Sequence, residues 1–172
     1  MEEKYTFLTL SPHGNIQHII EEDQRELSTK NLITPFYPLI CPIKKIENNT
    51  NSQNQRLILT EYQHLFQCKK TVFTLEQPCL YKNRLYRRLQ WNMQDDLPYS
   101  DIDFNGMKLN TNSFFYGTVK TKLQEDCIKK SNSLLTFKVF RLCIITFTIN
   151  KDFPNYYTWK ENCSIWTANN SR

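Results

Sequence analysis

Aromatic and basic residues alternate with apolar ones between Ser113 and Leu123, a pattern that suits a strand with two different faces. One set of alternating positions is core-like, and the other places Tyr116, Lys120 and Lys122 on a single face. Aromatic rings stack on bases and Lys ammonium groups neutralise phosphates, so this face could bind single-stranded nucleic acid. The same residues would suit a half-exposed sheet face equally well, and the pattern leaves both interpretations open.

A second concentration of positive charge lies between Lys69 and Met93. Six basic residues stand there against a single acidic one: Lys69, Lys70, Lys82, Arg84, Arg87 and Arg88. Such a cluster could follow a nucleic-acid backbone, although the charges of one helix face are often simply solvated. The candidate nucleic-acid-binding residues are therefore Tyr116, Lys120, Lys122, Lys69, Lys70, Arg84, Arg87 and Arg88.

No combination of residues indicates catalysis. His13, His18 and His64 lie apart and accompany no nucleophile motif, and 3 glycines are too few for a phosphate-binding loop. The 6 cysteines form neither a CxxC pair nor a zinc-ligand spacing, and Asp101 with Asp103 have no further metal ligands beside them. We therefore expect a non-enzymatic protein with reduced thiols and with no metal or other cofactor.

The composition favours strands over long helices. Hydrophobic residues make up 40% of the 172 positions and aromatic residues 13%, whereas Ala168 is the single alanine. A net charge of +5 permits an anionic partner without requiring one. The most apolar run, Leu134 to Ile149, contains Lys138 and Arg141 and is too short to span a membrane. We expect a mainly β domain with no membrane contact.

The first part of the chain predicts two hairpins. Lys4 to Leu10 and Ile16 to Glu21 are β-rich and flank a turn, which predicts a leading hairpin or arm within residues 1–38. Leu39 to Ile46 and Arg56 to Tyr62 flank a polar tip and predict a second hairpin. Thr60 to Gln67 would also suit a helical turn. A short strand is expected at Thr71 to Leu75.

A helix is predicted over Cys79 to Met93. Pro78 suits a first helical position, and Tyr81, Leu85, Leu89 and Met93 recur every four residues. Two β-rich segments follow, Asn112 to Gln124 and Leu134 to Thr148, and these should pair as a final hairpin. The aromatic residues 151–172 form a C-terminal tail.

This order of elements is that of an OB-fold, a five-stranded Greek-key barrel with one helix between the third and fourth strands. We predict such an OB-fold-like barrel over residues 39–150. Gly117 and Arg141 are where a curved barrel would need a bend. A bulge near Phe140 would turn Arg141 outward, and an ion pair with a buried carboxylate is the alternative.

Within OB-folds, the segments Asn112 to Gln124 and Leu134 to Thr148 resemble the small OB-fold subunit of the telomere-capping CST complex. The resemblance covers about a quarter of the chain, and the family's C-terminal helix is not legible in the aromatic tail. It implies a nuclear, telomere-associated subunit that binds larger OB-fold subunits and assists single-stranded DNA binding, with no small-molecule substrate.

A different class of protein fits the same strand content. A viral or parasite β-sandwich acting by protein contact alone would be cytoplasmic and would use the leading hairpin and the aromatic tail as its binding surface. Barrel and sandwich are not distinguished by the sequence.

Overall fold

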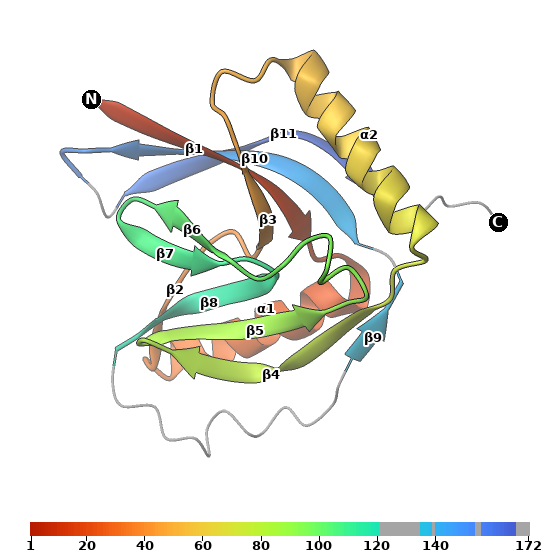
Figure 1. Ribbon diagram of the computed structural model, residues 1–172. Helices are drawn as coiled ribbons and strands as arrows, with labels where there is room; N and C mark the ends of the chain where they lie inside the picture. The colour runs from red at the N-terminus through yellow and green to blue at the C-terminus, as the bar shows by residue number, and fades with distance from the viewer. Residues whose placement is uncertain (121–134, 139, 154–155, 168–172) are drawn as a thin grey trace.

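The computed structural model describes residues 1–120, 135–138, 140–153 and 156–167 of the protein. Strands predominate among these residues, and two helices accompany them (Figure 1). The elements are β1 (Glu2–Ser11), α1 (Gly14–Thr29), β2 (Ile33–Pro35), β3 (Cys41–Ile46), α2 (Ser52–Cys68), β4 (Phe73–Tyr81), β5 (Arg84–Gln90), β6 (Asp101–Phe104), β7 (Met107–Asn110), β8 (Ser113–Val119), β9 (Leu135–Phe137), β10 (Arg141–Asn150) and β11 (Tyr157–Trp166).

The strands form open antiparallel sheets, which confirms the mainly β prediction. One sheet has four strands in the order β11-β10-β1-β3, and another has five in the order β2-β8-β5-β4-β9. The hairpin β6-β7 makes a small third sheet. Each order is linear, so each sheet of the described residues keeps two edge strands rather than closing on itself.

The two larger sheets face one another across an aromatic cluster. Phe36 lies at its centre, with ring centroids 5.0 Å from Phe115 of β8 and 6.1 Å from Phe147 of β10. Phe104 of β6 stands 5.0 Å from Phe147 and closes the cluster on the hairpin side. The rings come from all three sheets and from the segment after β2, so the cluster joins the sheets to one another. Aromatic pairs at these separations stabilise a protein beyond the effect of buried area alone.

Each large sheet has a helix on its other face. The helix α2 packs against β10 and β11, and its Phe66 and Leu59 are buried in the same apolar cluster as Leu142 and Ile144. The helix α1 lies behind β5 and β8 (Figure 1). The Gln24 side chain of α1 donates to the main-chain carbonyl of Tyr116 in β8 at 2.9 Å. The order of layers is therefore helix, sheet, sheet, helix.

The predicted leading hairpin is wrong, because residues 14–29 form α1 rather than a returning strand. Ile20, Gln24 and Leu27 lie three and four residues apart, and this spacing puts them on the face that α1 turns to the sheet. The preceding strand β1 pairs with β10 on one side and β3 on the other. It is thus a central strand, with Phe7 and Leu8 fully buried on opposite faces.

The predicted strand at Arg56 to Tyr62 is also wrong, since it belongs to α2, and the helical alternative for Thr60 to Gln67 is confirmed. The Asn51 side chain accepts a hydrogen bond from the backbone N–H of Asn54 at 2.8 Å and caps the helix. The Asn-rich segment that resembled a hairpin tip is therefore a helix start.

The predicted helix over Cys79 to Met93 is wrong, because β4 and β5 form a hairpin there. Lys82 and Asn83 have φ values of 48° and 62°, as both central residues of a type I′ turn require. A repeat of four residues fits two strand periods as well as it fits a helix, which explains the misassignment. Leu85 and Leu89 are accordingly buried on one side of β5.

The predicted final hairpin is wrong as well. The strand β8 pairs with β2 and β5, whereas β10 pairs with β1 and β11, so the two lie in different sheets. The expected linker at Glu125 to Ser133 lies outside the described residues. The aromatic tail includes β11, which pairs with β10 along its length.

Two features of β11 bear on the sites described below. A bulge places Asn162 as an extra residue, so that Tyr157 packs among the inter-sheet aromatics while Cys163 and Ile165 pack on the α2 side. Arg141 of β10 pairs with Glu161 of β11 at 2.9 Å. Both side chains are more than a third exposed, so Arg141 does form an ion pair, but the predicted burial of the carboxylate is wrong.

Gly117 occupies a bend in β8, as the sequence predicted for this position. It has φ +153°, and the register between β5 and β8 shifts there to leave Tyr116 as an extra residue. A Cβ atom on Gly117 would collide with the main-chain carbonyl oxygen of Thr34 in β2. The close approach of β2 to β8 therefore requires glycine.

We expect Gly117→Ala to lower the free energy of unfolding by about 3 kcal/mol, since an unfavourable φ and a backbone collision act together. Gly106→Ala is the matched control, because Gly106 has φ +79° but open space around it. The control should cost about 1 kcal/mol. Urea unfolding of both variants measures the difference, and equal losses would contradict the role given to the collision.

Candidate nucleic-acid interface

Tyr116 does not form the exposed stacking platform that the sequence predicted. Its side chain is fully buried beneath α1, because β8 is an inner strand whose Tyr116 face is covered by that helix. The hydroxyl donates to the Asp23 carboxylate at 3.4 Å, and burial raises the pKa of Tyr116 above its ordinary value. The ring is part of the core.

Arg87 is likewise a structural residue rather than a phosphate ligand. Its guanidinium is 1% exposed and pairs with Asp23 of α1 at 2.7 Å, while its Nε donates to the Glu76 carbonyl at 2.7 Å. Burial raises the pKa of Asp23, and the positive charge of Arg87 opposes this rise. The pair holds α1 against the middle of the five-stranded sheet.

The remaining predicted residues divide between two places. Lys69 and Lys70 follow α2, where Lys69 pairs with Asp96 at 3.6 Å and its carbonyl accepts from Asn92. Asn92 follows the C-terminal end of β5, whereas Arg84 is at the N-terminal end of the same strand. Lys122 lies outside the described residues. The fold therefore separates Lys69 and Lys70 from Arg84, although all three belong to the same predicted basic cluster.

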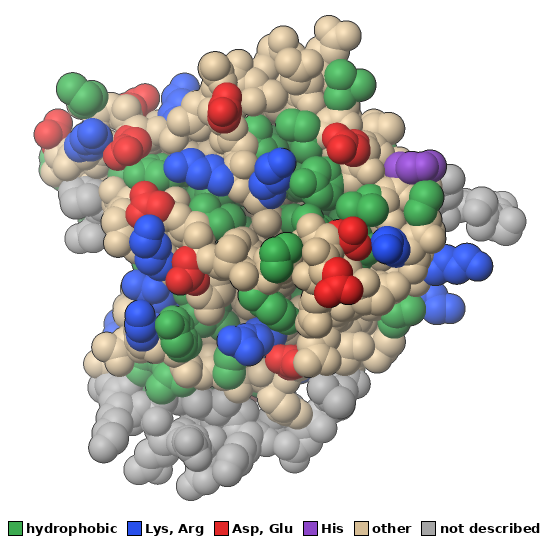
Figure 2. All heavy atoms as spheres, in the orientation of Figure 1, with side chains coloured by type: hydrophobic (Ala, Val, Ile, Leu, Met, Phe, Trp, Pro, Cys, Tyr) green, Lys and Arg blue, Asp and Glu red, His purple; other side chains and the backbone are tan. Residues whose placement is uncertain are grey.

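A basic end forms around the β4-β5 turn from Lys82, Arg84, Lys108 and Lys120. Arg84 donates to the Lys108 carbonyl at 2.6 Å. The backbone N–H of Val119 donates to the Asn83 carbonyl at 2.8 Å, which puts Lys120 next to the turn. Figure 2 shows Lys and Arg side chains gathered along the left edge of this face, beside the ends of β5 and β7. Arg84 and Lys120 were predicted as binding residues and Lys82 as a member of the basic cluster, whereas Lys108 was not predicted.

A tyrosine hollow of about 280 Å³ adjoins the basic end on the same side of the sheet. Its walls are Tyr81, Arg88, Tyr99, Ser100, Asp101 and Asn110. The two tyrosines are 43% and 40% exposed, unlike the buried Tyr116. Each has a cation over its ring, with Arg88 at 5.4 Å from the Tyr99 centroid and Lys82 at 5.3 Å from the Tyr81 centroid.

Hydrogen bonds to two buried residues hold one wall of the hollow in place. Thr111 accepts from the Ser100 backbone N–H at 2.8 Å, and its own N–H donates to the Ser100 carbonyl at 2.8 Å. Asn112 donates to the Leu97 carbonyl at 2.8 Å. The Tyr99 hydroxyl donates to the Leu89 carbonyl at 2.9 Å, and burial raises its pKa. Tyr99 therefore presents its ring from a fixed position.

The hollow combines the groups that an unpaired nucleobase needs. The tyrosine faces can stack on a base, and Ser100, Asp101 and Asn110 offer donors and acceptors to its edge. The basic end lies where a connected phosphate chain could pass. Sequence reasoning missed Tyr81 and Tyr99 because the first lay within the wrongly predicted helix and the second in a segment without period.

Comparison with known proteins identifies no relative. No protein-family model, curated protein or solved structure matches the chain.

Two further absences apply to the described part of the chain. It contains no group of three or more His, Cys, Asp or Glu side chains arranged to hold a metal ion. Neither of its helices has the length and apolar character that crossing a bilayer demands.

Replacing Arg87 tests its structural role. We expect Arg87→Met to lower the free energy of unfolding by about 3 kcal/mol at neutral pH, because the partly buried Asp23 carboxylate loses its partner. Arg88→Met, on the exposed side of β5, should cost less than about 1 kcal/mol. Adding Asp23→Leu to Arg87→Met should recover most of the loss, and urea unfolding measures all three variants.

The same variant has an expected pH dependence. The pKa of Asp23 is raised in the folded protein, so its protonated form favours folding below the unfolded value of 3.8, and this contribution is lost as pH rises through the folded pKa. Without Arg87 the folded pKa rises further. The destabilisation of Arg87→Met should therefore shrink as the pH is lowered from neutral toward the unfolded value, and a penalty independent of pH would contradict the pairing.

Proposed function

We propose that this protein binds single-stranded nucleic acid without enzymatic activity, using the tyrosine hollow for bases and the basic end for phosphates. The observation that carries the proposal is the pair of exposed tyrosines that share one hollow, each beside a cation. Stacking on such rings is tolerant of base identity, whereas lysine and arginine contacts follow the backbone. The proposal does not require a single OB-fold-like barrel, because the binding groups come from the hairpins β4-β5 and β6-β7 and the segments beside them.

The proposed setting is a nuclear complex that protects single-stranded or telomeric DNA. Its support is the sequence resemblance of Asn112 to Gln124 and Leu134 to Thr148 to the small subunit of the telomere-capping complex. In that setting a larger OB-fold subunit would be the partner. Recovery of such a subunit on purification from the native cell supports this setting, and recovery of unrelated proteins alone contradicts it.

A second candidate is a protein that acts by protein contact alone. The observation that favours it is the exposed strand β11, an edge of its sheet that presents Trp159 at 49% exposure. This candidate predicts no binding of single strands by the folded chain.

Tyr81→Ala should weaken binding of a fluorescein-labelled oligothymidine about tenfold, since loss of one base stack costs about 1–3 kcal/mol. Fluorescence anisotropy at low salt measures the affinity. Tyr156→Ala is the matched control, because Tyr156 is 77% exposed and is not among the residues that line the hollow. Equal affinities of the two variants would remove the hollow from the binding surface.

Replacing Lys82 and Arg84 together with Ala should reduce the salt dependence of binding. The slope of log affinity against log salt should fall in magnitude by about 1.4, at about 0.7 for each phosphate contact with a single strand. Replacing the exposed Lys44 and Lys160 of the other sheet is the control, and it should leave the slope unchanged. If the folded wild-type chain does not bind the oligothymidine, the nucleic-acid proposal is wrong and the protein-contact candidate is favoured.

A further inference from the structure

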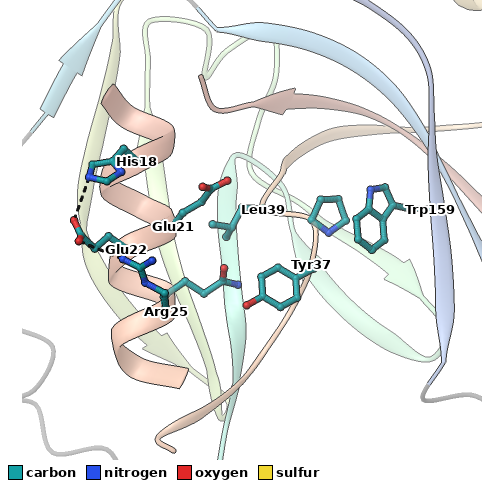
Figure 3. Close-up of a pocket in the computed structure, with 9 residues that line it drawn as sticks. His18, Glu21, Glu22, Arg25, Tyr37, Leu39 and Trp159 are labelled. Carbon is teal, nitrogen blue, oxygen red and sulfur yellow. Dashed lines mark hydrogen bonds and ion pairs between the residues drawn. The ribbon is translucent and has the colours of Figure 1, made fainter. Parts of the chain in front are cut away.

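A cleft of about 420 Å³ separates α1 from the segment that joins β2 to β3 (Figure 3). This is a volume typical of ligand sites. It lies on a different part of the molecule from the tyrosine hollow and shares no residue with it. Its walls are His18, Glu21, Glu22, Gln24, Arg25, Tyr37, Pro38, Leu39 and Trp159.

One wall of the cleft is aromatic. Tyr37 and Trp159 are 47% and 49% exposed, and Figure 3 shows both across the cleft from α1. The Tyr157 hydroxyl, from the same strand as Trp159, fixes the backbone of Tyr37, since it donates to the Tyr37 carbonyl at 2.7 Å and accepts from the Tyr37 N–H at 3.3 Å. The cleft therefore has two accessible ring faces on a held backbone.

The opposite wall carries a carboxylate without a cationic partner. Glu22 is 3.3 Å from Arg25 and 3.5 Å from the His18 imidazole, so the Arg25 guanidinium and the His18 ring of this helix face are engaged with Glu22. Glu21 accepts one hydrogen bond, from the neutral Gln17 amide at 2.9 Å. Among the described residues no Lys, Arg or His pairs with Glu21. Its negative charge is thus available to a ligand.

Gln24 adds an acceptor on the inner side of the cleft. The residue is 1% exposed, and its Nε2 donates to the carbonyls of Phe36 and Tyr116, each at 2.9 Å. These two bonds use both amide hydrogens and fix the orientation of the amide. Within the described part of the chain nothing donates to its Oε1. The Gln24 amide oxygen can therefore accept a hydrogen bond from a ligand that brings a donor into the cleft.

We propose that this cleft binds an arginine side chain presented by an extended segment of a partner protein. Guanidinium is planar, so it can stack on Trp159 or Tyr37 while its fork of donors reaches Glu21 and Gln24. Lysine offers a point charge without the planar fork and fits less well. The exposed π faces, the carboxylate without a cationic partner and the Gln24 amide oxygen all favour the same cationic donor.

The neighbouring strand gives the reason for an extended protein segment. Trp159 belongs to β11, the outermost strand of the four-stranded sheet, and no described strand pairs with its outer edge. A peptide that adds to such an edge gains main-chain hydrogen bonds, while alternate side chains enter neighbouring pockets. The partner segment thus combines strand pairing along β11 with an arginine in the cleft.

Nuclear magnetic resonance titration of the full chain tests this proposal. The indole N–H signals of Trp91, Trp159 and Trp166 are observed, with Trp159→Phe identifying the Trp159 signal. The probe is the blocked peptide acetyl-Val-Thr-Arg-Thr-Val-amide, and its matched control contains citrulline, the neutral isostere of arginine. The Trp159 signal should shift in a saturable way with the arginine peptide and at least about tenfold more weakly with citrulline.

Two variants locate the contact. Glu21→Gln should weaken binding of the arginine peptide by about fivefold or more, since it removes the unpaired charge and keeps the shape. Glu61→Gln, an equivalent change at an exposed position of α2, should leave binding unchanged.

Three results would overturn the proposal. They are equal binding of the citrulline peptide, equal affinities of Glu21→Gln and Glu61→Gln, and acetyl-arginine-amide binding as tightly as the peptide. The last result would contradict the claim that an extended segment presents the arginine, because strand pairing along β11 would then contribute nothing to the affinity.

Discussion

The contact of Phe36 with Phe147 and Phe115 is the interaction on which the arrangement of this protein depends. Each large sheet is covered by its own helix, and the aromatic cluster fills the space between the two sheets. A second apolar cluster also joins the two halves, through the contacts of Phe140 with Phe73 and Phe114. The aromatic cluster also positions both candidate sites. Phe36 is followed by Tyr37 at the cleft, and Phe104 anchors the hairpin whose strand ends supply Asp101 and Asn110 to the hollow. Loosening of this cluster would displace both sites together.

The helix α1 shows how neighbouring residues divide structural and surface roles. Asp23 and Gln24 point to the five-stranded sheet and bind Arg87 and the Tyr116 carbonyl. Glu21 and Glu22 come two residues earlier in the helix and line the cleft. Burial sets the difference, because a buried carboxylate must have a partner whereas an accessible one keeps its charge for a ligand.

The sequence was sufficient to predict the strand-rich class and the bend at Gly117. It was ambiguous where the same spacing of apolar residues fits both a helix and a strand. Leu85, Leu89 and Met93 are four residues apart, and the spacing alone could not separate a helix from a hairpin. Tyr116 was predicted to be exposed because alternation identifies two faces without saying that a helix covers the second. The tyrosine hollow was not predictable, since Tyr81 and Tyr99 meet only through pairings between distant segments. The predicted site at Lys122 remains a prediction.

The bulge at Asn162 has a consequence for how the protein unfolds. Residues before it in β11 contribute to the inter-sheet aromatics, and residues after it contribute to the layer under α2, so one strand takes part in both apolar clusters. Detachment of β11 would admit water to both at once. The two layers should therefore behave as one cooperative unit, with secondary structure and aromatic packing lost in a single transition on heating.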